Sequence, residues 1–182
     1  MKEIRLVEVR AAETDEMVVE GYAAVFDTVT DLGWSKEVID RAAFNDADLS
    51  DIVMKYNHED SVLPLARTRG GTLTFNIDDH GMKIRARLID TTQNKDIYKL
   101  IKEGILTKMS FAFTVKEESY DYETDTRRIL AFDKIFDVSV VDVPAYETTE
   151  IYARSKEEYE AEKNKYKELK LAKEKAKAIL SL

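Results

Sequence analysis

TLTFNIDDHGMKIRARLI, residues 72–89, is the stretch that best reveals the fold. Apolar and polar residues alternate on both sides of the central DDHG, as they do in strands that bury one face. Gly81 can supply the positive φ that a tight turn needs. The stretch therefore predicts a β-hairpin with His80 in its turn.

Other short runs of strand character lie on either side of this hairpin. One is expected within 2–10 and another at 17–26, where Gly21 indicates a bulge or a close approach of two backbones. Further strand-like runs, rich in β-branched and aromatic residues, occupy 52–57, 105–115, 128–136 and 138–143.

Helical periodicity is clearest at 91–103, where apolar residues recur at helical spacing. Thr91 or Thr92 can cap the start of this helix, and Gly104 is well placed to end it. Residues 38–49 are expected to hold one or two short helical turns. The body is therefore predicted to be mainly β with peripheral helices (α+β), as a small closed or half-closed barrel.

The end of the chain differs in kind from the body. Residues 154–182 contain no Gly and no Pro and are rich in helix formers, so they predict a long charged helix. They carry nine Lys and Arg against six Glu, a net charge of +3, which leaves −11 for the other 153 residues. We expect a domain at 1–153 and a charged helical tail at 154–182. A merely solvated helix would have the same composition.

Composition excludes several classes of protein. The 182 residues, 44% of them hydrophobic, suffice for one compact domain. No window holds the roughly 18 apolar residues of a membrane span, and no signal peptide is recognisable, so we expect an intracellular protein without a membrane partner. With no Cys and only two His, no metal site and no cofactor are expected. The net charge of −8 argues against nucleic acid as a partner.

The two histidines differ in their settings. His58 directly follows the short apolar strand at 52–57. An imidazole can take up and return a proton near neutral pH, which makes His58 a candidate general base. From its position alone, an ordinary loop histidine is the simpler interpretation. His80 is a weaker candidate because a tight turn is a typical exposed setting.

Ser110 lies among apolar residues in the run at 105–115. Such a serine usually packs in the interior or hydrogen-bonds to the backbone. As a nucleophile it would need an adjacent base, which only a contact between strands could bring to it. It does not lie in a Gly-x-Ser-x-Gly elbow, so the sequence does not indicate an α/β-hydrolase.

Asp137 and Asp142 lie in an apolar run, where a carboxylate is costly to bury unless it is paired. Either could orient an imidazole and stabilise its charged form, as the acid of a serine triad does. The alternative is that they lie on the solvated face of an edge strand. Asp137 shares a strand face with Ser139. Glu147, in the loop after Pro144, is a third candidate.

The body contains EGYAAVF (20–26), AAF (42–44), NH (57–58) followed by PLA (64–66), GILTKMSFAF (104–113) and DVSVVDVPA (137–145). Taken in this order, the five segments resemble the prohead protease family of tailed phages, which is itself similar to the herpesvirus assemblins. The resemblance covers roughly residues 18–150, nearly the whole body.

The resemblance implies a set of catalytic residues. His58 would be the general base and Ser110 the nucleophile. Asp137 stands where the family usually has Glu and would be the third member, with Asp142 and Glu147 as alternatives. The related viral proteases have a histidine in that role, so its identity tolerates change. Three glycines of the family pattern are replaced here, by Ala42, Ala66 and Ala112.

The resemblance also implies a fold and a function. The fold would be a small assemblin-like β-barrel with a C-terminal charged helix. The chain would be a serine endopeptidase that cleaves scaffold protein, or the scaffolding segment of the major capsid protein, and itself. It would act in the phage procapsid in the host cytoplasm, encoded by a phage or prophage, with homodimers or higher self-association expected by analogy.

Two other functions fit the same sequence. One is a catalytically inactive scaffold or capsid-binding assembly module of the same fold. The other is an unrelated β-barrel binding protein with a coiled-coil tail. Only the enzyme requires the side chains of His58 and Ser110 to lie close together.

Overall fold

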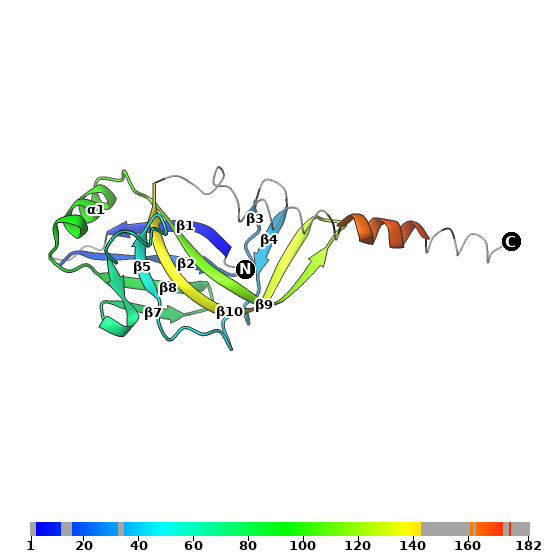
Figure 1. Cartoon of the computed structure of the whole chain (residues 1–182), viewed down its shortest axis with the longest axis horizontal. Helices are drawn as coiled ribbons and strands as arrows, with labels where there is room; N and C mark the ends of the chain where they lie inside the picture. The colour runs from blue at the N-terminus through cyan, green and yellow to red at the C-terminus, as the bar shows by residue number, and fades with distance from the viewer. Residues whose placement is uncertain are drawn as a thin grey trace.

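The computed structural model describes residues 3–11, 16–32, 35–142, 161, 163–172 and 175 of the chain (Figure 1). In chain order the elements are β1 (Glu3–Ala11), β2 (Val18–Val25), β3 (Thr30–Asp31), β4 (Lys36–Ile39), β5 (Val53–Tyr56), β6 (Ala66–Arg67), the 3-10 helix η1 (Thr68–Gly70), β7 (Leu73–Ile77), β8 (Gly81–Arg87), α1 (Thr92–Lys102), β9 (Lys108–Asp121) and β10 (Thr126–Val141).

The strands form one mixed sheet in the order β3-β4-β10-β9-β1-β2-β8-β7, and β5 pairs with β10 and with β6. β4 and β5 run parallel to β10, whereas the other pairs are antiparallel. In the described ladders β6 pairs only with β5, and β7 only with β8, so the ends of the sheet are not joined. The mainly β fold is confirmed, but the sheet is open and a closed barrel is not shown. An assemblin-like barrel stays a prediction.

The predicted hairpin at 72–89 is present as β7 and β8, with Phe75 opposite Ile84. Gly81 was expected to supply a positive φ to the turn, but its φ is not positive. A glycine is required here for a different reason. A Cβ at this position would lie 2.0 Å from the carbonyl oxygen of Ala24 on the neighbouring strand. The turn is held instead by Asp78, whose carboxylate accepts hydrogen bonds from the backbone N–H groups of His80 and Gly81.

Gly21 is likewise a point of close backbone approach, as its position in an apolar strand predicts. A Cβ there would lie 2.4 Å from the carbonyl oxygen of Glu8 in β1. The register between β2 and β8 also shifts between Tyr22 and Ala24. Both alternatives named for Gly21, a close approach and a bulge, are therefore found at or beside it.

α1 begins and ends as its sequence predicts. The Thr91 side chain accepts a hydrogen bond from the backbone N–H of Asn94, and Gly104 after the helix has φ +70°. The segment 38–49 is different, because residues 38–39 belong to β4 and residues 41–46 form hydrogen-bonded turns. Residues 128–136 and 138–141 of the two predicted runs belong to one long strand, β10.

The core lies on one face of β9 and β10. Phe111 and Phe113 of β9 and Phe132 of β10 are completely buried, with ring centroids 4.8 Å apart for Phe113 and Phe132. Phe44 packs against Phe132 from the turns that follow β4. Since side chains alternate along a strand, the residues between these phenylalanines face the other side of the sheet.

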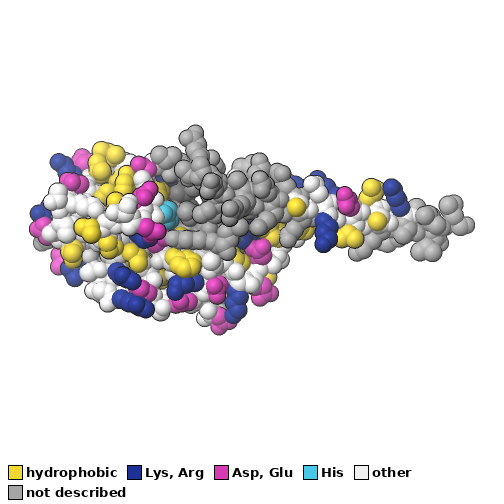
Figure 2. All heavy atoms as spheres, viewed as in Figure 1, with side chains coloured by type: hydrophobic (Ala, Val, Ile, Leu, Met, Phe, Trp, Pro, Cys, Tyr) yellow, Lys and Arg dark blue, Asp and Glu magenta, His cyan; other side chains and the backbone are white. Residues whose placement is uncertain are grey.

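The far end of the β9–β10 hairpin carries the tail helix (Figure 1). Residues 161, 163–172 and 175 are helical, and the Tyr166 ring stacks on Tyr122 at a centroid distance of 4.8 Å. Lys163 pairs with Asp125, and Lys170 Nζ lies 2.5 Å from Glu123 Oε1. The basic helix therefore lies against an acidic hairpin tip, and Figure 2 shows basic and hydrophobic side chains interspersed along this helix. None of the described helices has the length and apolar character needed to cross a bilayer.

A buried ion cluster stabilises the same hairpin where β4 joins it. The Arg127 guanidinium donates to Glu37 Oε2 over 3.1 Å and to Glu118 Oε2 over 2.8 Å. The side chains of Arg127 and Glu37 are only 7% and 2% exposed. Removing one partner from such a cluster leaves a buried charge without its counter-ion.

We therefore expect Arg127→Met to lower the free energy of unfolding by about 3–5 kcal/mol. The matched control is Arg128→Met at the next position, where the side chain is 42% exposed and pairs with Asp27 and Asp40. This change should cost under about 1 kcal/mol. Urea denaturation measures both, and equal losses would show that burial of the cluster contributes nothing.

Candidate active site

The backbone at His58 has an unusual conformation. After β5 the chain takes two successive left-handed residues, Asn57 with φ 52° and His58 with φ 57°. Such conformations are costly for residues other than glycine and persist only where the surroundings hold them. Here the Asn57 N–H donates to the Val140 carbonyl, and Asn57 Oδ1 accepts from the Asp142 N–H at 3.1 Å. His58 is thus fixed beside the end of β10.

The Asp137 carboxylate faces the His58 ring. Asp137 Oδ1 lies 2.5 Å from His58 Nδ1, and the Asp137 side chain is 1% exposed. Sequence reasoning placed these residues in one site only through the family resemblance. Asp142 has a different partner, because its carboxylate accepts a hydrogen bond of 2.9 Å from the Tyr56 hydroxyl. Burial, and then this hydrogen bond, raise the pKa of Tyr56. Glu147 lies outside the described residues.

Strand register places Ser110 on the same face of the sheet as Asp137. Ser139 of β10 is paired with Ser110 of β9 on one side and with Lys55 of β5 on the other. Directly opposite residues in adjacent strands have Cβ atoms about 4.5–5.5 Å apart, so the Ser110 and Ser139 side chains are neighbours. The Ser139 hydroxyl is itself 3.2 Å from His58 Nδ1. Folding thus brings Ser110, His58 and Asp137 to one locality, although they are far apart in sequence.

Two polar atoms of this locality have no hydrogen-bond partner among the described residues. They are Ser110 Oγ and His58 Nε2, and both are buried. Buried polar atoms are nearly always bonded, so an exception calls for a functional or structural explanation. His58 Nε2 is the ring nitrogen opposite the one that meets Asp137. A general base in a serine triad receives the nucleophile's proton on that nitrogen.

The Ser110 side chain has no exposed surface in this structure. A substrate carbonyl carbon must come into contact with Oγ before it can be attacked. A productive complex therefore requires this hydroxyl to become accessible to the substrate. The His58 side chain is also largely buried, with 13% exposed.

Sequence reasoning assigned no role to two residues of this cluster. Ser139 donates a hydrogen bond of 3.0 Å to Asp137 Oδ1. Lys55 Nζ lies 4.0 Å from the other oxygen of that carboxylate and also pairs with the exposed Asp60. The alternation of β10 had placed Ser139 on the face of Asp137. Only the parallel pairing of β5 with β10 reveals Lys55.

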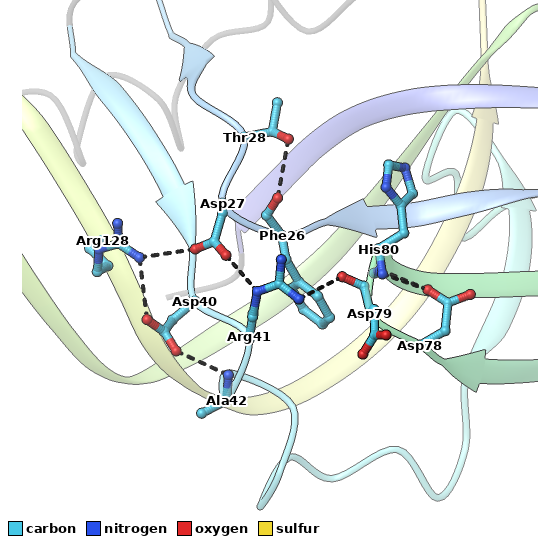
Figure 3. A network of polar contacts seen from close by, with 11 residues as sticks. Phe26, Asp27, Thr28, Asp40, Arg41, Ala42, Asp78, Asp79, His80 and Arg128 are labelled. Carbon is cyan, nitrogen blue, oxygen red and sulfur yellow. Dashed lines mark hydrogen bonds and ion pairs between the residues drawn. The ribbon is translucent and has the colours of Figure 1, made fainter.

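His80 belongs to a separate network (Figure 3). Its ring packs edge-on against Tyr22 at 4.5 Å. Beside it, Arg41 donates to Asp27 Oδ2 and to the Asp79 carbonyl. The hydrogen bond from Arg41 lowers the pKa of Asp27. Arg41 lies in the turns after β4 and Asp79 in the turn between β7 and β8, so their hydrogen bond, and not a strand ladder, links the two ends of the sheet. The network contains neither Ser110 nor Asp137.

No group of three or more His, Asp or Glu side chains suitable for a metal is found in the part of the chain that the structure describes. The cluster around His58 brings together three kinds of side chain. A hydroxyl, an imidazole and a carboxylate in one place are the components of acyl transfer by nucleophilic catalysis.

Comparison with known proteins agrees with this chemistry. The family model described as Caudovirus prohead serine protease matches residues 5–164. No curated protein and no solved structure matches the chain. The family match covers β2 to β10, all of β1 except its first two residues, and the cluster residues Lys55, His58, Ser110, Asp137 and Ser139. The chain therefore belongs to the caudovirus prohead serine proteases, a family of serine peptidases that act in phage capsid maturation.

Proposed function

We propose that this serine protease cleaves scaffold protein, or the scaffolding segment of the major capsid protein, inside the phage procapsid, and that it also cleaves itself. Ser110 is the nucleophile, His58 the general base and Asp137 the acid that orients the base. The observation that carries these roles is the 2.5 Å contact of His58 Nδ1 with Asp137 Oδ1, one strand away from Ser110. Self-association of the chain stays a prediction.

The proposed reaction has two halves. Ser110 Oγ attacks the scissile carbonyl carbon while His58 Nε2 accepts the hydroxyl proton, and the imidazolium then gives that proton to the leaving amine. Water attacks the resulting acyl-enzyme and loses a proton to the same nitrogen, which releases the acid and restores Ser110. Throughout, Asp137 holds the proton on Nδ1 and stabilises the charged ring.

Co-expression tests the proposed substrates. The chain is produced together with the major capsid protein and scaffold protein of the same phage, and mass spectrometry identifies any new termini. We expect defined cleavage with the wild-type chain and none with the Ser110→Ala variant. An intact capsid and scaffold protein beside a folded wild-type chain would favour the inactive assembly module instead.

A second part of the proposal concerns the tail at 154–182, which we assign to binding of scaffold or capsid protein during assembly. Its described helix is strongly basic, with Lys163 and Lys170 engaged by the hairpin tip. Leu169 and Leu171 are about half exposed, so the helix keeps apolar surface available to a partner.

Removal of residues 154–182 is therefore expected to reduce packaging of the enzyme severalfold. The comparison uses the Ser110→Ala background, so that both forms meet unprocessed capsid protein. The ratio of protease to capsid protein in purified procapsids measures packaging. Equal incorporation of the full-length and shortened chains would refute the assignment.

A further inference from the structure

Ser139 lies at the centre of the cluster and is completely buried. Its hydroxyl oxygen is 3.0 Å from Asp137 Oδ1 and 3.2 Å from His58 Nδ1. Ser139 thus lies within reach of the imidazole and Ser110 is its neighbour on the adjacent strand, so the roles of the two serines must differ. The difference follows from where the protons are.

The close contact of Asp137 Oδ1 with His58 Nδ1 needs a proton between the two atoms. With the Asp137 carboxylate ionised, it only accepts hydrogen bonds, so Nδ1 carries that proton and has no free lone pair. The Ser139 hydroxyl cannot then give its proton to Nδ1, and donates to the carboxylate. A nucleophile would have to face Nε2, on the opposite side of the ring.

We infer that Ser139 is a positioning residue, which holds the Asp137 carboxylate in the orientation that keeps the proton on His58 Nδ1. The hydroxyl fixes Oδ1, while Lys55 Nζ lies 4.0 Å from Oδ2 on the other side. Rotation of the carboxylate about its Cβ–Cγ bond would lose both interactions. Hydrogen bonds to charged groups are among the stronger ones, so this restraint is substantial. The inference rests on the catalytic roles proposed for Ser110, His58 and Asp137.

Kinetics on a peptide that spans the mapped cleavage site test the role. For Ser139→Ala we expect kcat to fall about 10- to 100-fold, the equivalent of one hydrogen bond to a charged group, with KM unchanged. Ser119→Ala, at an exposed position of β9, is the matched control and should leave both constants unchanged. In an Asp137→Ala background, Ser139→Ala should cause no further loss, because its effect passes through the missing carboxylate.

Nuclear magnetic resonance of the imidazole gives a readout that does not depend on turnover. With ¹⁵N-labelled histidine, the wild-type chain should hold His58 as the Nδ1–H tautomer. Ser139→Ala should increase the share of the Nε2–H form. If alanine prevents folding at this buried site, Ser139→Cys keeps a similar volume with a weaker donor and should give smaller changes in the same direction.

The outcomes separate this inference from the proposed function. If Ser110→Ala is inactive while folded Ser139→Ala or Ser139→Cys keeps wild-type kcat and the same tautomer, only the role of Ser139 is wrong. An equal loss with and without the Asp137 carboxylate would also overturn it. If Ser139→Ala abolishes cleavage while Ser110→Ala retains it, Ser139 is the nucleophile, and both the inference and the assignment of Ser110 fail.

Discussion

Replacing Ser110 by alanine is expected to lower kcat for peptide cleavage about 10⁶-fold, the scale of loss when a catalytic serine is removed from a triad. The variant keeps His58 and Asp137 in contact but offers no atom that can form the acyl bond. Hydrolysis of the peptide measures the loss, and titration with a serine-directed phosphonylating reagent should find no modified residue.

The same variant is expected to be at least as stable as the wild-type chain. Ser110 Oγ is buried without a hydrogen-bond partner among the described residues, so its removal relieves a desolvation cost. We expect Ser110→Ala to melt at the wild-type temperature or above it, which also rules out misfolding as the cause of inactivity. Ser119→Ala, on the exposed part of the same strand, should remain fully active. Cleavage by a folded Ser110→Ala chain at the wild-type rate would end the assignment of the nucleophile.

Asp137→Asn is expected to lower kcat about 10⁴-fold, because an amide stabilises the wrong tautomer of the imidazole. The fold should remain intact. The side chains have nearly the same size, so the packing around this buried position is retained. Loss of the negative charge also removes the stabilisation of the imidazolium that forms during proton transfer.

Asp142→Asn is the matched control for this change. The Asp142 carboxylate accepts a hydrogen bond from Tyr56, and an amide oxygen can still accept it. We therefore expect a small change in kcat. Kinetics of both variants on the same peptide decide between the two acids. A large loss for Asp142→Asn and a small one for Asp137→Asn would make Asp142 the third catalytic residue.

Local chemistry made several elements of the fold predictable. The hairpin of β7 and β8 and the helix α1 follow from alternation, periodicity and caps, all of which act within a few residues. The reason for Gly81 could not be found in the same way. It depends on the carbonyl of Ala24, some 57 positions earlier in the chain, which only the pairing of β2 with β8 brings near.

The same limit applies to the site. A resemblance in short motifs named His58, Ser110 and Asp137, but their proximity depends on the register of β10 with β9 and β5. A shift of one residue in that register would send Ser110 to the opposite face. Lys55 and Ser139 carry no motif of their own, so sequence reasoning could not give them a role. Sequence reasoning could not predict the stacking of Tyr166 on Tyr122 either, because this contact joins the tail to a distant turn.

The enclosure of Ser110 has a consequence for how this enzyme should be measured. If the hydroxyl reacts only in molecules that have opened, an observed rate is the product of an opening equilibrium constant and an intrinsic chemical rate. If one molecule in about a hundred is open, apparent affinity for any substrate or inhibitor falls by the same factor of about a hundred. A binding partner whose surface favours the open form would then activate proteolysis without changing the arrangement of the catalytic residues.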